Sequence, residues 1–96
     1  MPQAIWTSET HPIRVDWLPV GGPGCVGMTF APGKCASSKY QHGTWKRDLA
    51  TDLDRLVRME RADVLVCLIE NHELRRLEIP TLFEDAEKRG LKVVHL

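Results

Sequence analysis

The chain has 96 residues, enough for one small domain with a modest core. Its 13 basic residues balance 13 acidic ones, so there is no overall field that would attract nucleic acid or a membrane surface, and we expect neither as a partner. No apolar run approaches the roughly 20 residues of a membrane span, and the N-terminus lacks the pattern of a signal peptide, so a cytoplasmic protein is expected.

The N-terminal third is expected to contain two strands. Residues 1–12 show no periodicity and are expected to form a tail or an edge segment, whereas residues 13–96 form the domain. Apolar and polar residues alternate over 13–20, which predicts a half-buried strand. The turn signal at 21–24 separates it from a second expected strand over 25–31.

A polar segment and then a helix follow. Residues 34–44 are small and polar and predict a long surface loop. Residues 45–61 carry apolar residues at helical spacing, which predicts an amphipathic helix. Its apolar stripe comprises Leu49, Leu53, Leu56 and Val57. On the more polar side, spacing predicts ion pairs between Asp52 and Arg55 and between Asp54 and Arg58.

The C-terminal third predicts an α/β fold. Residues 64–69 form a continuous apolar run that is typical of a strand buried on both faces. A helix is expected over 80–89 and another strand over 92–96. Strands that alternate with helices predict a mostly parallel sheet with helices on both faces, in the order β–β–α–β–α–β. A buried strand at the chain end also suggests that part of the domain lies elsewhere.

The three cysteines, Cys25, Cys35 and Cys67, do not form a recognisable disulfide or metal pattern. Their number is odd and their spacing irregular, which argues against a disulfide framework. The spacings of Cys25, Cys35 and His42 match no common zinc-ligand pattern, so we expect no metal and no cofactor. Cys67 lies in an apolar run and is expected to be a core residue.

Four stretches of the sequence share a pattern with one known family. They are Gly27-Met28-Thr29-Phe30-Ala31-Pro32-Gly33-Lys34, Trp45-Lys46-Arg47-Asp48-Leu49 with Asp52-Leu53 and Leu56, Val64 to Leu74, and Gly90 to Leu96. Together they resemble the kinase-associated phosphatase and its bacterial relatives, within the dual-specificity and tyrosine phosphatase superfamily. They span most of residues 13–96 in the same order and register as in that family. The resemblance implies a partial cysteine-phosphatase fold, comprising the N-terminal half only.

The catalytic loop of that family is absent from this sequence. The family uses His-Cys, five residues and Arg, because backbone N–H groups and the arginine bind the phosphate while the thiolate attacks it. The positions six residues after the three cysteines hold Ala31, Gln41 and Glu73. All three fail this test, so we expect no catalytic residue in the chain. An enzymatic activity of the chain by itself is not predicted.

Four basic residues near the 34–44 segment form the candidate substrate-binding site: Lys34, Lys39, Lys46 and Arg47. They are expected either to help receive an anionic phospho-substrate or to form a solvated surface. Trp17 and Trp45 are expected to pack rather than to stack on a ligand. Glu70 and Glu73 follow a predicted strand, where α/β folds bind ligands, but capping or salt bridging is the simpler interpretation.

Three functions are consistent with the residues. The first is the N-terminal portion of a cysteine-dependent tyrosine or dual-specificity phosphatase, inactive alone, acting on a phosphoprotein or phosphopeptide through the complete domain. The second is a stand-alone, non-catalytic module that binds a phosphoprotein or another protein. The third is a small enzyme or redox protein that uses Cys35 or Cys67. For the first we expect self-association, or pairing with a C-terminal half, because an uncovered sheet exposes apolar residues. The second predicts a stable monomer or dimer that binds a phosphopeptide saturably.

Overall fold

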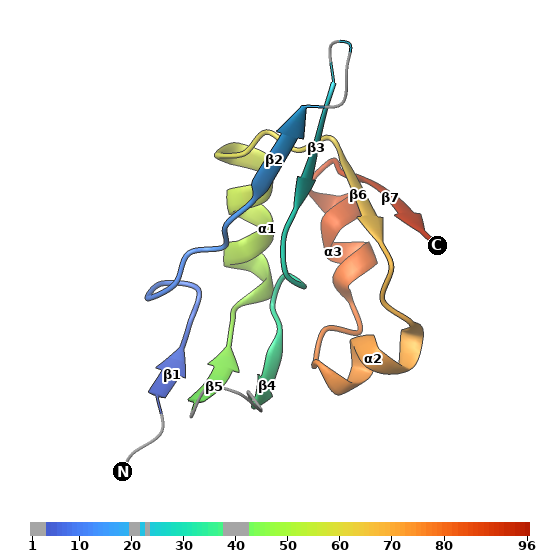
Figure 1. Cartoon of the computed structure of the whole chain (residues 1–96). Coiled ribbons are helices and arrows are strands. Elements are labelled where there is room, and N and C mark those ends of the chain that lie inside the picture. The colour runs from blue at the N-terminus through green and yellow to red at the C-terminus, as the bar shows by residue number, and fades with distance from the viewer. Residues whose placement is uncertain (1–3, 20–21, 23, 38–42) are drawn as a thin grey trace.

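The computed structural model describes residues 4–19, 22, 24–37 and 43–96 (Figure 1). Short strands make up its N-terminal part, and helices alternate with strands in its C-terminal part. In chain order the elements are β1 (Ala4–Trp6), β2 (Asp16–Pro19), β3 (Cys25–Met28), β4 (Cys35–Ser37), β5 (Gly43–Lys46), α1 (Leu49–Arg58), β6 (Val64–Cys67), α2 (Asn71–Arg76), α3 (Leu82–Lys88) and β7 (Lys92–His95). No helix in these described ranges is long and apolar enough to cross a membrane.

The strands form three small sheets rather than one. The first has the order β1-β5-β4, with β1 parallel and β4 antiparallel to β5. The second is the antiparallel pair β2–β3, and the third is the parallel pair β6–β7. The prediction of a mostly parallel sheet with helices on both faces, as a partial cysteine-phosphatase fold in the order β–β–α–β–α–β, is therefore wrong.

The physical reason for this correction is the position of the helices. Figure 1 shows the β2–β3 and β6–β7 pairs on the same side of α1 and α3. Leu65 and Cys67 of β6 therefore pack on the core, whereas Val64 and Val66 remain about half exposed. A strand that looks buried on both faces in the sequence is covered on one face only, because nothing in the described chain lies on the other.

A single apolar core lies between the helices and the inner faces of these strands. Residues from all three helices reach it, and the segments before β2 and between α2 and α3 add to it. The buried members are Ile13, Leu53, Leu56, Cys67, Leu74, Ile79, Leu82, Ala86 and Leu91. The expected core position of Cys67 is confirmed. Full burial of one such side chain stabilises the fold by about 1.5–3 kcal/mol, so the α1 stripe is a large part of what holds this fold together.

The segment before α1 is more ordered than its composition predicts. A polar loop is expected over 34–44, but Cys35–Ser37 and Gly43–Lys46 form strands β4 and β5. Residues 38–42 between them lie outside the described residues. The helix expected from residue 45 begins at Leu49, because Trp45 and Lys46 pair with β4 instead. Pairing with β1 and β4 outweighs local composition here.

Helix α1 begins where Asp48 caps it. The Asp48 carboxylate accepts hydrogen bonds from the Thr51 backbone N–H at 2.9 Å and from the Thr51 hydroxyl at 2.7 Å. These bonds occupy one of the orphan N–H groups of the first turn, and the negative charge favours the positive end of the helix dipole. The two hydrogen bonds from Thr51 lower the pKa of Asp48 below its ordinary value of 3.8.

Replacing Asp48 with Ala is expected to destabilise the fold by about 1 kcal/mol, the usual cost of losing such a cap. Because the folded-state pKa is depressed, the contribution is present above the ordinary pKa and is lost as the pH falls through the lower, folded value. Urea unfolding of both proteins at pH 7 and at pH 2.5 measures this. The difference in the free energy of unfolding between the wild type and Asp48→Ala should be smaller at pH 2.5 than at pH 7. An unchanged difference would show that the cap stabilises the helix without its negative charge.

Candidate functional site

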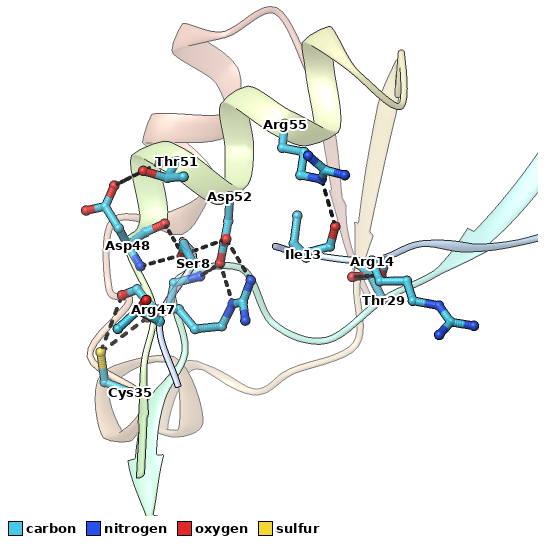
Figure 2. Close-up of polar contacts among 12 residues, drawn as sticks. Ser8, Ile13, Arg14, Thr29, Cys35, Arg47, Asp48, Thr51, Asp52 and Arg55 are labelled. Atoms are coloured by element: carbon cyan, nitrogen blue, oxygen red, sulfur yellow. Dashed lines mark hydrogen bonds and ion pairs between the residues drawn. The ribbon is translucent and has the colours of Figure 1, made fainter. Parts of the chain in front are cut away.

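The most constrained polar site in the described chain is centred on Asp52 of α1. One carboxylate oxygen accepts the Gly33 backbone N–H and the Arg47 Nε–H, each at 2.8 Å. The other accepts the Ser8 hydroxyl at 2.8 Å and Arg47 Nη2–H at 3.0 Å. Figure 2 shows Ser8 and Arg47 directed toward Asp52. We call Ser8, Gly33, Arg47 and Asp52 the Asp52 network.

The Asp52 network joins four segments that are distant in the sequence. Ser8 follows β1, Gly33 lies in the turn between β3 and β4, Arg47 follows β5, and Asp52 lies in the first turn of α1. Ser8 Oγ also accepts the Asp48 backbone N–H at 2.8 Å, which connects it to the helix cap. The network therefore positions both the N-terminal segment and the β3–β4 turn against the start of α1.

The Arg47–Asp52 ion pair is fully enclosed. The exposed fractions of the two side chains are 0% and 1%, and the guanidinium binds the carboxylate through two nitrogens. Its carbon lies 5.8 Å from the ring centres of both Phe30 and Trp45, so the remaining cation surface faces aromatic rings. The outer nitrogen, Nη1, has no hydrogen-bond partner among the described residues. Such a buried pair adds little net free energy over apolar residues of similar volume, but removing one of its partners is strongly destabilising.

The structure separates the basic residues that the sequence groups together. The Lys34 ammonium lies 5.6 Å from the ring centre of Trp45, on the same face of the β4–β5 pair as Arg47. Lys46 is exposed and points to the opposite face, because neighbouring strand residues alternate. The Arg47 side chain has no exposed surface to offer a phosphate. Lys39 lies outside the described residues. Of the other three, Lys34 and Arg47 share a face beside Trp45, whereas Lys46 points to the opposite face.

Cys35 is the cysteine closest to the Asp52 network. Its Sγ lies 3.5 Å from the carbonyl oxygen of Gly33 and 3.7 Å from that of Arg47, both hydrogen-bond acceptors (Figure 2). Burial and the nearby carboxylate of Glu78 raise the pKa of the Cys35 thiol above its ordinary value of 9.0. A thiol donating to carbonyls is the protonated form, which is the poor nucleophile. The site therefore does not activate Cys35.

Iodoacetamide at pH 8 is expected to alkylate Cys35 at least severalfold more slowly than the exposed Cys25. The raised pKa keeps the thiolate fraction small until the pH exceeds 9.0, and partial burial limits access. Peptide-level mass spectrometry over time gives both rates. In urea the two rates should become similar, and similar rates in the native chain would contradict the assignment.

The other residues that the sequence singled out take part in core packing, surface ion pairs or aromatic contacts. Cys67 is 5% exposed and belongs to the core. Glu70 and Glu73 lie 3.3 and 3.9 Å from ring nitrogens of His72 at the exposed start of α2, where an ion pair contributes little. Trp45 packs against Trp6 and Phe30, at ring-centre distances of 4.7 and 5.5 Å. Among the described residues, no three His, Cys, Asp or Glu side chains lie close enough together to hold a metal ion.

Sequence reasoning overlooks Ser8, and it places Asp52 on the polar side of the helix with Arg55, whereas the structure buries Asp52 with Arg47. Asp52 lies three residues after Leu49 and four before Leu56, so it occupies a position of the apolar stripe itself. A charged residue at such a position signals a buried partner, here Arg47. Ser8 carries no comparable signal, because its partners lie 40 or more residues away.

No family model, curated protein sequence or solved structure matches this chain. The comparisons therefore neither add to nor subtract from the resemblance described above, which rests on the residues of the four stretches alone. The function has to be argued from those residues and from the geometry of the Asp52 network.

Proposed function

We propose that the chain is the N-terminal portion of a cysteine-dependent tyrosine or dual-specificity phosphatase, and that it is inactive by itself. The observation that carries the proposal is the Asp52 network. It joins Gly33 of the first resembling stretch to Arg47 and Asp52 of the second, through a buried ion pair and a 2.8 Å backbone hydrogen bond. Three residues of the resembling stretches thus hold distant segments of the fold together.

The state of the cysteines supports the second half of the proposal. Cys67 is buried in the core, and the raised pKa of Cys35 keeps its thiol protonated. Arg47, whose backbone carbonyl lies 3.7 Å from Cys35 Sγ, already has its guanidinium bound to the Asp52 carboxylate. Phosphoryl transfer to a cysteine needs a thiolate with a free arginine beside it. This role would therefore have to come from a separate segment with the His-Cys-x5-Arg motif, which supplies the nucleophile and binds the phosphoprotein or phosphopeptide.

Two measurements test the proposal. The first is the coding sequence downstream of the Leu96 codon, where a His-Cys-x5-Arg motif is expected. The second is hydrolysis of p-nitrophenyl phosphate by the 96-residue chain and by the chain extended through that motif. We expect activity only in the extended protein, and its loss when the cysteine of the motif is replaced with Ser. Absence of the motif would contradict the proposal, as would activity of the 96-residue chain.

A second candidate is a stand-alone module that binds a phosphoprotein or another protein without catalysis. It is favoured by the large apolar side chains that remain exposed on the strands, Met28 and Val66 among them. Isothermal titration of the chain with phosphotyrosine, phosphoserine and unmodified peptides distinguishes the two forms of this candidate. If phosphopeptides bind saturably and unmodified peptides do not, the chain recognises phosphoproteins. If none of the peptides binds, phosphoprotein recognition is excluded.

A further inference from the structure

Two strand pairs expose apolar side chains on the same side of the molecule. In β2–β3 the register places Leu18 opposite Val26, and Met28 lies two residues further along on the same face. In β6–β7 the alternation places Val64 and Val66 on one face. Leu68 directly follows β6 at the next position of the same alternation, where the Leu96 N–H still bonds to the Cys67 carbonyl. All six of these side chains are exposed, by between 48% and 72%. We call these six residues the outer apolar face.

The helices cannot cover the outer apolar face, because they already cover the opposite one. Val15 before β2, Leu65 of β6 and Val93 of β7 turn inward and pack against the core. In Figure 1, α1 and α3 lie together behind the strands, so the outer faces of both pairs point away from them. Water is thus in contact with one whole side of each strand pair.

The outer apolar face exposes more apolar area than the surface of a typical monomer does. Phe30 and Leu96 border it and are 47% and 78% exposed. With them, eight large apolar residues that are 47–78% exposed lie on the outer side of the two strand pairs. At roughly 100 Å² for a half-exposed large apolar residue, they present on the order of 800 Å² in total, about what one partner contributes to a standard protein interface. The largest apolar patch of a typical monomer is roughly 300–600 Å². Burying such a face against a second molecule would strongly favour association.

The charges on this face favour a second copy over a charged partner. By register, the charged residues on the outer side of the two pairs are Asp16, opposite Met28, and Lys92, opposite Val64. Arg14 lines the same surface hollow as Asp16, Met28 and Phe30, and its guanidinium lies 3.2 Å from the Asp16 carboxylate. The face therefore carries one ion pair and one further base, and the whole chain has a net charge of zero. A mostly apolar surface with so little net charge is compatible with a second copy of itself, which is what a two-fold interface between identical chains requires.

We propose that the 96-residue chain forms a two-fold dimer in which the outer apolar face of one copy covers that of the other. The inference does not depend on the proposed phosphatase role, since it follows from exposure, register and charge. A C-terminal segment that completes the domain would compete for the same face. The dimer is accordingly the form of this chain in the absence of such a segment.

Sedimentation equilibrium of the 96-residue chain tests the proposal. The expected mass is twice the 10.9 kDa of one chain over a tenfold range of micromolar concentrations. Replacing Val66 with Glu, or Met28 with Lys, should weaken the dimer at least tenfold, because each buries a charge without a partner. Both sites are exposed in the single chain, so circular dichroism should show an unchanged fold.

Met59→Lys is the matched control. Met59 is 66% exposed and directly follows α1, away from the outer apolar face. It should leave the dimer unchanged. A monomer mass for the wild-type chain would overturn the proposal, as would dimers that persist in both Val66→Glu and Met28→Lys. A mass that rises without limit would indicate open-ended strand addition at an edge, and would overturn it too. None of these readouts involves phosphatase activity, so they are separate from the test of the proposed function.

Discussion

Replacing Asp52 with Ala is expected to destabilise the protein by about 3–5 kcal/mol, the range found when one partner of a buried ion pair is removed. The Arg47 guanidinium would remain buried without its counter-charge, and its side chain is 0% exposed. Gly33 N–H and the Ser8 hydroxyl would lose their acceptor as well. For a chain of this size, such a loss is a large part of the total stability. Urea unfolding followed by circular dichroism, at one fixed protein concentration, measures it.

Asp54→Ala is the matched control for this prediction. Asp54 lies two residues further along the same helix and accepts a hydrogen bond from Arg89 Nε at 2.8 Å, the same distance as the Arg47–Asp52 bond. Its side chain is 46% exposed, so water can replace the partner. We expect a cost of at most about 1 kcal/mol. Equal effects of the two substitutions would show that burial does not distinguish these pairs. If Asp52→Ala does not fold, the volume-matched Asp52→Asn replaces it.

Gly33→Ala is expected to cost about 2–4 kcal/mol, which combines left-handed strain with overpacking. Gly33 has a φ of +74°, a conformation that residues with a side chain rarely adopt. An added Cβ would lie 2.7 Å from Leu49 Cβ and 2.9 Å from both Leu49 Cα and Ile79 Cγ2. Helix α1 would have to move away from the β3–β4 turn, which would weaken the hydrogen bond between Gly33 and Asp52. The midpoint of urea unfolding is the measurement.

Two other glycines separate the causes of this effect. Gly22 has a φ of +87°, but no described residue lies within 4 Å of an added Cβ, so Gly22→Ala should show only the strain, about 1–2 kcal/mol. Gly24 has no positive φ and likewise no described neighbour within 4 Å of an added Cβ, so Gly24→Ala should stay within about 0.5 kcal/mol of the wild type. If all three substitutions have similar effects, the close approach of α1 to Gly33 does not contribute.

The candidate site could be predicted from the sequence only in part. Spacing along a helix predicts pairs of Asp52 with Arg55 and of Asp54 with Arg58, since these residues are neighbours on its surface. In the structure Asp52 pairs with Arg47, and Asp54 with Arg89. The Arg55 guanidinium instead donates to the carbonyl oxygen of Ile13 at 3.1 Å. Local spacing identifies which residues are charged, whereas the packing of distant segments decides which charges meet.

The basic residues illustrate the same limit. Lys34, Lys46 and Arg47 are close in sequence, and their shared charge suggests one surface. Strand alternation sends Lys46 to the face opposite Lys34 and Arg47, and burial removes Arg47 from solvent. The sequence does not show that residues 45 and 46 belong to a strand, because the pairing of β5 with β1 and β4 is non-local.

The sequence by itself determined the local elements whose signal is short-range. The apolar stripe of Leu53 and Leu56, the core position of Cys67, and strands near residues 64–69 and 92–96 all follow from periodicity and composition. Only the tertiary structure decided how these elements assemble. Whether a strand such as β6 is covered on one face or two depends on where the helices pack. Hydrophobicity along the chain measures a tendency to be buried, and it does not say which segment provides the cover.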